Sequence, residues 1–170
     1  MTDARTLQPD DRIAHYRIVA PLGAGGMGEV YLAQDRTLER QVALKILPPE
    51  LVRSQERVRR FVQEAKSASS LNHPNIVTIY EIGEDRVQPS SGGAGEASEP
   101  VRYIAMELVA GKTLGAKIYE ERTDLRTLLG YLAQAAEGIA KAHAAGIVHR
   151  DLKPANIMVG AFGEVQVMDW

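Results

Sequence analysis

The sequence of 170 residues contains no cysteine, and this absence excludes several kinds of chemistry. Without cysteine the chain can form no disulfide, no thiolate metal site and no thiolate nucleophile. The lack of cysteine also fits a reducing compartment. Any catalytic chemistry must therefore use carboxylates, amides, hydroxyls, lysines or histidines.

The chain also lacks an excess of basic charge and a long apolar run. It has 20 Lys and Arg residues against 22 Asp and Glu residues, so its net charge is -2, which gives no reason to expect nucleic acid as a partner. No apolar run approaches the roughly 20 residues of a membrane-spanning helix. The N-terminal stretch from Met1 to Asp11 is polar and does not resemble a signal peptide. We therefore expect a cytoplasmic chain without a membrane segment of its own.

The hydrophobic patterns that are present predict an α+β fold. The length favours one domain. Helical spacing of apolar residues predicts two helices, at 51–71 and from Asp124 to Gly146, and Asn72-His73-Pro74-Asn75 ends the first of them. Leu125, Leu128, Leu129, Leu132, Ala136 and Ile139 are expected to form the apolar face of the second helix. Strand patterns occur at 16–22, 29–33, 41–47, 76–80 and 101–108, with shorter ones at 157–159 and 165–168.

A glycine-rich segment joins the first two predicted strands. Gly23 to Gly28 fits the pattern G-x-G-x-x-G, which alone is weak evidence. A dinucleotide-binding fold would need a helix directly after the last glycine, but Val30-Tyr31-Leu32 follows and reads as a strand. The glycines are therefore predicted to lie in the turn of a hairpin.

Three motifs occur in a fixed order along the chain. Gly23 to Val30 fits G-x-G-x-x-G-x-V, Val42 to Lys45 fits V-A-I-K with leucine in place of isoleucine, and His149 to Asn156 fits H-R-D-L-x-x-x-N. Together they resemble the Ser/Thr protein kinases of the eukaryotic-like type, and most closely their bacterial branch. The resemblance extends from about His15 to the last residue, where Asp169-Trp170 stands at the place of Asp-Phe in the Asp-Phe-Gly motif.

The resemblance implies a protein-kinase-like fold. We expect an N-terminal tail at 1–14, a small lobe and hinge at 15–109 and the start of a large lobe at 110–170. The small lobe would hold a five-stranded antiparallel sheet and one helix. The large lobe would be incomplete, with its first helices and the catalytic loop. The Ser- and Gly-rich segment 86–100 is expected to be a flexible loop within the small lobe.

The resemblance also implies binding of ATP. Val30 and Ala43 would form the roof of the adenine slot and Met158 its floor, while Glu107 and Val109 would hydrogen-bond the adenine edge. The full set of implied nucleotide-binding residues is Gly23, Ala24, Gly25, Gly26, Met27, Gly28, Val30, Ala43, Lys45, Met106, Glu107, Val109 and Met158.

The catalytic roles follow from the same resemblance. Lys45 would hold the α- and β-phosphates and Glu64 would hold Lys45. Asp151 would accept the proton of a protein Ser or Thr hydroxyl, with Lys153 on the transferring phosphoryl group. The expected metal ligands are Asn156 and Asp169, whose hard oxygens suit Mg²⁺, with Mn²⁺ as an alternative metal.

Two functions stay open at this point. The first is a Ser/Thr protein kinase, of which this chain is expected to be an inactive fragment because the activation loop and later helices would follow Trp170. The second is a truncated, inactive nucleotide-binding or scaffold module. The unpaired apolar face of the helix after Asp124 could let copies of the chain self-associate. A longer protein could carry a membrane anchor beyond residue 170.

Overall fold

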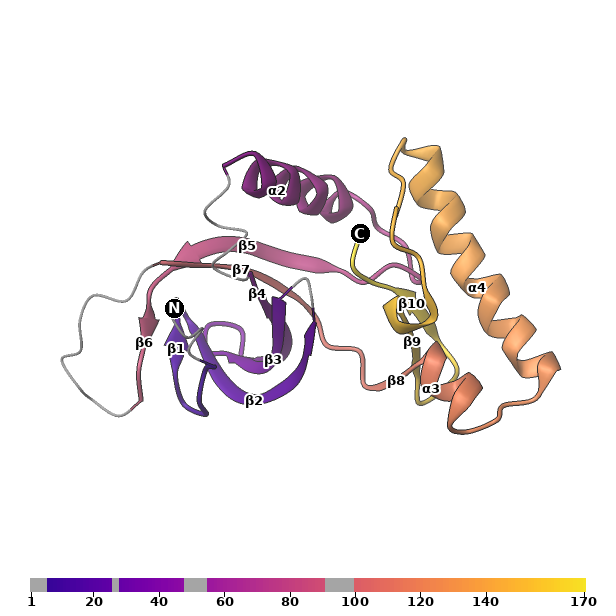
Figure 1. Cartoon of the computed structure of the whole chain (residues 1–170), viewed down its shortest axis with the longest axis horizontal. Helices are drawn as coiled ribbons and strands as arrows, with labels where there is room; N and C mark the ends of the chain where they lie inside the picture. Colours follow the sequence, from indigo (N-terminus) through magenta and orange to yellow (C-terminus); the bar gives the residue numbers. More distant parts are fainter. Residues whose placement is uncertain (1–5, 26–27, 48–54, 91–99) are drawn as a thin grey trace. The chain divides into compact units, whose positions relative to one another are not determined.

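The chain folds into two compact units (Figure 1). The computed structural model describes residues 6–25, 28–47, 55–90 and 100–170. The first unit comprises Met1–Gln63 and Ile79–Leu108, and the second comprises Glu64–Thr78 and Val109–Trp170. A β-sheet dominates the first unit, whereas the second combines helices with a small sheet.

The sheet of the first unit is antiparallel and has the strand order β5-β7-β4-β3-β2-β1-β6. Its longer strands correspond to the five that the sequence predicts, and two strands of two residues each are added at one edge. The strands are β1 Arg12–Ile13, β2 Tyr16–Gly25, β3 Gly28–Asp35, β4 Arg40–Ile46, β5 Ile79–Asp85, β6 Val87–Gln88 and β7 Val101–Glu107.

The prediction for the fourth strand is wrong in its position. The sequence predicts a strand at 76–80, but β5 begins at Ile79. Ile76 instead forms an isolated parallel bridge with Val167, and the Val77 N–H donates to the Val167 carbonyl at 3.0 Å. The Val77 N–H therefore pairs with Val167 and not with the sheet of the first unit that the hydrophobic pattern suggests.

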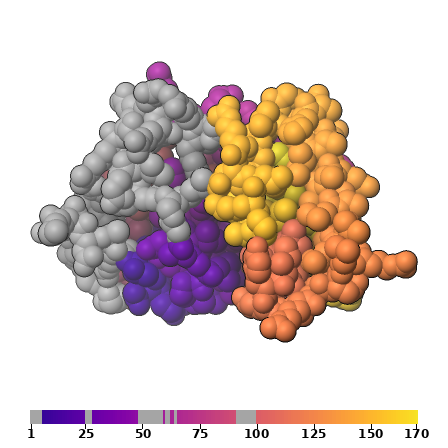
Figure 2. All heavy atoms as spheres, turned by 45° about the vertical axis from the view of Figure 1, so that its right-hand side comes forward, coloured from indigo at the N-terminus to yellow at the C-terminus, as the bar shows by residue number. Residues whose placement is uncertain are grey.

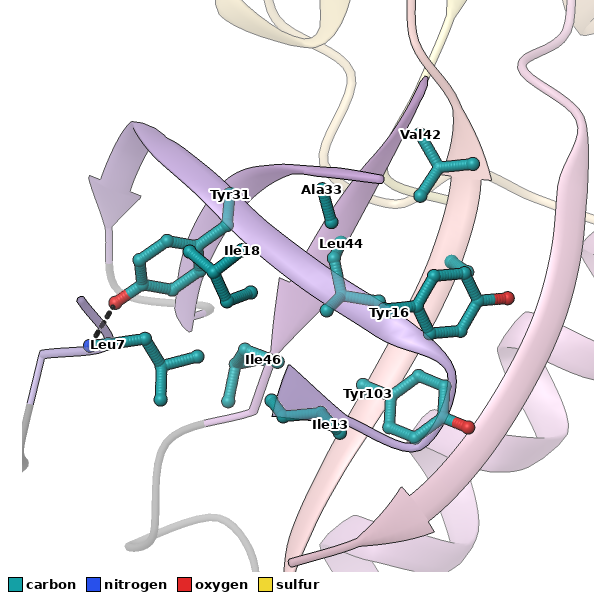
Figure 3. Packing of buried hydrophobic residues seen from close by; sticks show 11 residues of the cluster. Leu7, Ile13, Tyr16, Ile18, Tyr31, Ala33, Val42, Leu44, Ile46 and Tyr103 are labelled. Carbon is teal, nitrogen blue, oxygen red and sulfur yellow. Dashed lines mark hydrogen bonds between the residues drawn. The ribbon is translucent and has the colours of Figure 1, made fainter. Parts of the chain in front are cut away.

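One face of the first sheet carries its hydrophobic core (Figure 3). Side chains alternate between the two faces of a strand, so every second residue of β3, β4 and β7 contributes to this core. The core residues are Leu7, Ile13, Tyr16, Ile18, Tyr31, Ala33, Val42, Leu44, Ile46, Tyr103 and Ala105.

The segment before the first long strand belongs to this packed unit. Leu7 is buried, and its N–H donates to the Tyr31 hydroxyl at 3.0 Å. The buried Asp11 carboxylate accepts hydrogen bonds from the Gln8 and Ser90 N–H groups.

Strand β6 lies inside the predicted loop 86–100, and residues 91–99 of that loop lie outside the described residues.

A carboxylate joins two tyrosines across the sheet. Glu81 accepts hydrogen bonds from the hydroxyls of Tyr16, at 2.9 Å, and Tyr103, at 2.6 Å. Burial, together with the hydrogen bond to Glu81, raises the pKa of both phenols, so both stay neutral and donate throughout the physiological range. These bonds fix β2, β5 and β7 to one another.

The second unit is built on a three-stranded antiparallel sheet in the order β10-β9-β8. Helix α4 packs against β10 (Figure 1). The elements are β8 Gly111–Thr113, α3 Leu114–Tyr119, α4 Leu125–Ala144, the 3-10 turn η1 Pro154–Asn156, β9 Ile157–Gly160 and β10 Val165–Val167. The short strand β8 and the short helix α3 precede α4 along the chain.

The predicted ends of α4 are confirmed. The Asp124 side chain accepts a hydrogen bond from the Thr127 N–H at 3.1 Å, as an N-cap does. Gly146 follows the helix with a φ of 75°, a left-handed conformation that glycine adopts without strain. Both signals are local, which is why the sequence alone predicts them.

The predicted apolar face of α4 is only partly correct. Leu128 and Ile139 pack against the core of the second unit, but Leu125 is 71% exposed, and Leu129, Leu132 and Ala136 are exposed as well. The buried positions are small: Ala135, Gly138 and Ala142. Figure 2 shows the atoms of α4, in orange, at the surface of the second unit.

Helix α2, Gln55–Ser69, lies within the predicted helix 51–71. Ala65 and Ala68 of this helix are buried. The side chain of Glu64 lies outside the described residues.

Among the helices that the structure describes, none is both long and apolar enough to cross a membrane.

Candidate functional site

Four of the predicted nucleotide-binding residues of the first unit share one face of its sheet. In the strand register Val30 lies opposite Lys45, and Ala43 lies opposite Met106. Directly opposed residues point to the same side of a sheet. None of these four belongs to the core cluster, which takes the alternate positions of the same strands. The face opposite the core therefore presents apolar side chains around one lysine.

Lys45 is buried in this setting, with only 6% of its surface exposed. A buried ammonium group is stable only where other polar or charged groups compensate for the water that it loses. The sequence assigns this role to Glu64, whose side chain lies outside the described residues. The pairing of Lys45 with Glu64 therefore stays a prediction.

The glycine segment forms the predicted hairpin. Gly23 lies opposite Val30 and Gly25 opposite Gly28 in the β2–β3 register, which excludes the strand-to-helix geometry of a dinucleotide-binding fold. Gly28 has a φ of 119°, a conformation that side chains rarely allow. Gly26 and Met27, which were predicted to contact nucleotide, lie outside the described residues.

Packing against the described residues does not require a glycine at position 23. A Cβ atom built at Gly23 meets no atom of the described residues within 4 Å. The backbone of this hairpin therefore borders open space. A glycine at such a position allows a ligand to approach the main chain closely.

The second unit brings together two predicted catalytic side chains and one predicted metal ligand. The Lys153 Nζ donates to Asp151 Oδ2 at 2.7 Å. The Asn156 Nδ2 donates to the Asp151 carbonyl at 2.9 Å and to Asp151 Oδ2 at 3.3 Å. Asn156 is buried and sits at the end of η1, whereas Lys153 and Asp151 are partly exposed. One carboxylate thus faces one ammonium group and one amide.

This arrangement keeps Asp151 ionised. The hydrogen bond from Lys153 lowers the pKa of the Asp151 carboxyl below its usual value, and the hydrogen bond from Asn156 acts in the same direction. An ionised carboxylate can accept a hydrogen bond from a substrate hydroxyl at neutral pH.

Replacing Lys153 by methionine should raise the pKa of the Asp151 carboxyl, because methionine removes the donor and the positive charge while it keeps the apolar stem. Carboxyl-carbon NMR of the 170-residue chain across pH 2 to 6 measures this pKa. In the wild type, the stability that comes from a depressed carboxyl pKa is present above the unfolded value of about 4 and is lost as the pH falls through the lower folded value. An unchanged Asp151 titration in the variant would contradict the assigned contact.

His149 links the catalytic loop to the last strand. The Asp151 N–H donates to the His149 carbonyl at 2.8 Å and, at 3.3 Å, to its ring Nδ1. With Nδ1 as the acceptor, the ring Nε2 carries the proton and donates to the Met168 carbonyl at 2.7 Å. These bonds give the buried His149 side chain a structural role. Arg150 follows His149 and Asp169 follows Met168 along the chain. Their φ values of 62° and 61° cost conformational free energy in residues other than glycine.

Asn156 and Asp169 offer the oxygen ligands that Mg²⁺ prefers. The Asn156 amide nitrogen is used by Asp151, which leaves the amide oxygen as the atom available to a cation. In the described part of the chain, no group of three or more His, Asp or Glu residues is arranged to hold a metal. This donor set fits Mg²⁺, which takes one or two protein ligands and completes its shell with phosphate oxygens and water.

The remaining predicted nucleotide contacts divide between the two units. Met106 is buried in β7, and Glu107 ends that strand. Val109 begins the second unit's main segment and is partly exposed. Met158 lies in β9 opposite Gln166 and Thr113, between two buried core residues that point to the other face.

Two polar residues of the second unit were not singled out from the sequence. Asn75 is buried and donates from its side chain to the Val165 carbonyl at 2.8 Å. Gln134 accepts a hydrogen bond from the Val165 N–H and donates to the Gly163 carbonyl. In the sequence, Asn75 reads only as part of a helix-ending segment and Gln134 as one polar residue of a helix. No local pattern distinguishes them.

The comparisons with known proteins agree with this geometry. Residues 16–170 match the family model of the protein kinase domain. A probable serine/threonine-protein kinase of Streptomyces coelicolor is 45% identical over 161 residues, which are 91% of this chain and 22% of that protein. The serine/threonine-protein kinases PrkC of Bacillus subtilis and PknB of Mycobacterium tuberculosis are 42% and 41% identical, again over 91% of this chain, which spans 22% and 24% of their lengths.

The solved structures give the same result. Two variants of the kinase domain of M. tuberculosis PknI superimpose with TM-scores of 0.77 and 0.80, at 30% and 28% identity. Each match covers 97% of this chain and 62% of the solved domain. The predicted kinase-like α+β fold is therefore confirmed, and the chain belongs to the protein kinase domain family.

Proposed function

We propose that the protein is a Ser/Thr protein kinase that transfers the γ-phosphoryl group of ATP to protein hydroxyls. The observation that carries this proposal is the Asp151 carboxylate, which is held ionised by Lys153 and oriented by Asn156. A scaffold would have no need for a positioned proton acceptor. The names of the relatives, all Ser/Thr protein kinases, support the same class of reaction.

The first unit presents groups of the kinds that would hold a nucleotide. A nucleotide could approach the main chain of the glycine hairpin closely at Gly23, where a Cβ atom would meet no described atom, and backbone N–H groups there would suit phosphate oxygens. Lys45 would supply the positive charge for the α- and β-phosphates. Ala43 and Met106, on the same sheet face as Lys45, would provide apolar contacts for the adenine ring.

In the transfer step, the oxygen of a Ser or Thr hydroxyl forms a new bond to the γ-phosphorus. The bond from the γ-phosphorus to the bridging oxygen of ADP breaks, and ADP leaves. The hydroxyl proton passes to Asp151. The Lys153 ammonium group, which contacts Asp151, then neutralises part of the negative charge on the transferring phosphoryl group. Positioning and charge neutralisation of this kind supply most of the catalysis in phosphoryl transfer.

Asn156 and Asp169 would hold Mg²⁺, or Mn²⁺ in its place. When bound, the ion would neutralise charge on the phosphate oxygens. The turn η1 holds Asn156, since its N–H donates to the Lys153 carbonyl at 2.9 Å, and its own carbonyl accepts a hydrogen bond from the Met168 N–H at 2.9 Å. The two proposed ligands are thus joined through the backbone of adjacent segments.

A calorimetric titration of the 170-residue chain with ATP tests the nucleotide site. We expect one ATP per chain in the presence of Mg²⁺, and much weaker binding when the metal is removed by a chelator. Binding of ATP that is insensitive to the metal, or no binding at all, would contradict the proposal. Binding without phosphoryl transfer by a form that spans a whole kinase domain would instead favour the alternative, a nucleotide-binding or scaffold module.

A further inference from the structure

Strand β10 forms one edge of the small sheet of the second unit. Its residues pair with β9 on one side, through Val165 with Val159, Gln166 with Met158 and Val167 with Ile157. On the other side, no further strand of that sheet follows within the part of the chain that the structure describes. The outward N–H and C=O groups of an edge strand must find other partners or water.

All four outward backbone groups of β10 are hydrogen-bonded, and most of their partners come from one short segment. The Val165 carbonyl accepts from the Asn75 side chain at 2.8 Å. The Val167 N–H donates to the Asn75 carbonyl at 2.9 Å, and the Val167 carbonyl accepts from the Val77 N–H at 3.0 Å. Asn75 is 6% exposed, so these bonds are shielded from water.

Gln134 of α4 completes the set. Its side-chain oxygen accepts from the Val165 N–H at 3.2 Å and from the Asn75 side chain at 3.4 Å. Its side-chain nitrogen donates to the Gly163 carbonyl at 2.9 Å, in the turn just before β10. The two amide side chains therefore hold both polar groups of Val165 and also bind each other.

A close approach of backbone to helix supports this arrangement. A Cβ atom at Gly138 would lie 2.6 Å from the Asn75 carbonyl oxygen, a distance that real Cβ atoms essentially never show. Glycine at this position lets the segment around Asn75 lie directly against α4. The segment is thus fixed between the helix and the strand.

The residue that follows β10 by one position is Met168, and the next is Asp169. Two hydrogen bonds hold the backbone of Met168. Its N–H donates to the Asn156 carbonyl at 2.9 Å, and its carbonyl accepts from the His149 ring at 2.7 Å. Asp169 then has a strained φ of 61°. Such a conformation persists only where the surrounding structure holds it.

We propose that Asn75 and Gln134 are positioning residues that hold β10 so that Asp169 is preorganised as a metal ligand. The inference rests on the proposed function of Asp169 and adds two residues that do not touch the metal. Partners behind metal ligands typically change metal affinity about 10- to 100-fold when they are removed.

The test uses Asn75→Asp, an isosteric change in the 170-residue chain. The aspartate turns the donor that faces the Val165 carbonyl into an acceptor, so the hydrogen bond is lost and two oxygens face each other. Asn72→Asp is the matched control, because Asn72 is exposed in the same segment. Gln134→Met, which keeps a long helix-compatible side chain and removes its hydrogen bonds, is the second variant if Asn75→Asp does not fold.

The first readout is amide hydrogen exchange without nucleotide or metal. We expect exchange at Val165, Val167 and Met168 to become about 10-fold faster or more in Asn75→Asp, with no change in the Asn72→Asp control. The second readout is the Mg²⁺ concentration that gives half-maximal ATP binding in calorimetry. It should rise about 10- to 100-fold, and saturating Mg²⁺ should restore ATP affinity. A variant that merely folded less well would lose binding stoichiometry instead.

The outcomes separate the two proposals. If the wild type binds ATP without Mg²⁺ dependence, or if Asp169→Ala leaves that dependence unchanged, the assignment of Asp169 fails and the positioning role fails with it. If Asp169→Ala removes the Mg²⁺ dependence but Asn75→Asp leaves the Mg²⁺ midpoint at the wild-type value, the positioning role alone is overturned. Faster exchange together with a wild-type midpoint also overturns it, because the two side chains would then serve only stability.

Discussion

Replacing Asp151 by asparagine should remove most phosphoryl transfer in a form of the protein that spans a whole kinase domain. Asparagine keeps the shape of the side chain and an oxygen for Lys153 and Asn156, but it cannot accept a proton from the substrate hydroxyl. Loss of a positioned general base typically lowers a rate about 10²- to 10⁴-fold. We expect the affinity for Mg-ATP to change little, because Asp151 is assigned to the hydroxyl and not to the nucleotide.

Initial rates of label transfer from ATP to a Ser/Thr substrate measure this effect. Asp124→Asn is the matched control: Asp124 caps α4 through the Thr127 N–H, and asparagine caps helices as well as aspartate does. Its rate should equal that of the wild type. An Asp151→Asn enzyme that retained full turnover would remove Asp151 from the reaction.

Combining Lys45→Met with Asp169→Ala should nearly abolish binding of Mg-ATP by the 170-residue chain. Lys45 is assigned to the phosphates and Asp169 to the metal that the phosphates share. A hydrogen bond to a charged group contributes roughly 1.5–3 kcal/mol. Loss of both contacts should therefore weaken binding by about 100-fold or more. Titration calorimetry at fixed Mg²⁺ measures the change.

The double variant Lys112→Met with Asp10→Ala makes the same chemical changes at exposed positions. Lys112 forms a surface ion pair with Glu121, and Asp10 forms one with Arg17, and the loss of such exposed contacts changes stability little. This control should bind Mg-ATP like the wild type. If the Lys45 and Asp169 variant also bound like the wild type, the nucleotide site would have been assigned to the wrong residues.

Features with a local signal could be predicted from the sequence. The glycines of the hairpin, the Asp124 cap and the alternation in β4 that separates Lys45 from the core each depend on residues a few positions apart. The catalytic loop is equally local, and the structure brings Lys153 and Asn156 onto Asp151. Such signals do not depend on how distant segments pack.

The buried face of α4 could not be predicted in this way. Periodicity gives most weight to large apolar residues, and it therefore selected Leu125, Leu129 and Leu132, all of which are exposed. The packed side is lined by small residues because Gly138 lies directly against the backbone of Asn75. That contact joins residues more than 60 positions apart, so no window along the chain contains it.

The contacts of Asn75 and Ile76 could not be predicted from the sequence for the same reason. Their sequence context predicts a helix end followed by a strand, which is the common outcome for such a pattern. In the structure this segment hydrogen-bonds to β10, some 90 residues further along the chain. The partner of a polar side chain over that distance is decided by tertiary packing and not by propensity.

Transfer of labelled γ-phosphate from ATP to protein tests the central claim most directly. A form of the protein that spans a whole kinase domain is incubated with Mg²⁺, labelled ATP and a protein substrate rich in Ser and Thr, and the labelled amino acids are identified after hydrolysis. We expect label on phosphoserine or phosphothreonine that depends on Asp151. Label on tyrosine alone, release of phosphate to water without transfer, or transfer that persists in Asp151→Asn would contradict it.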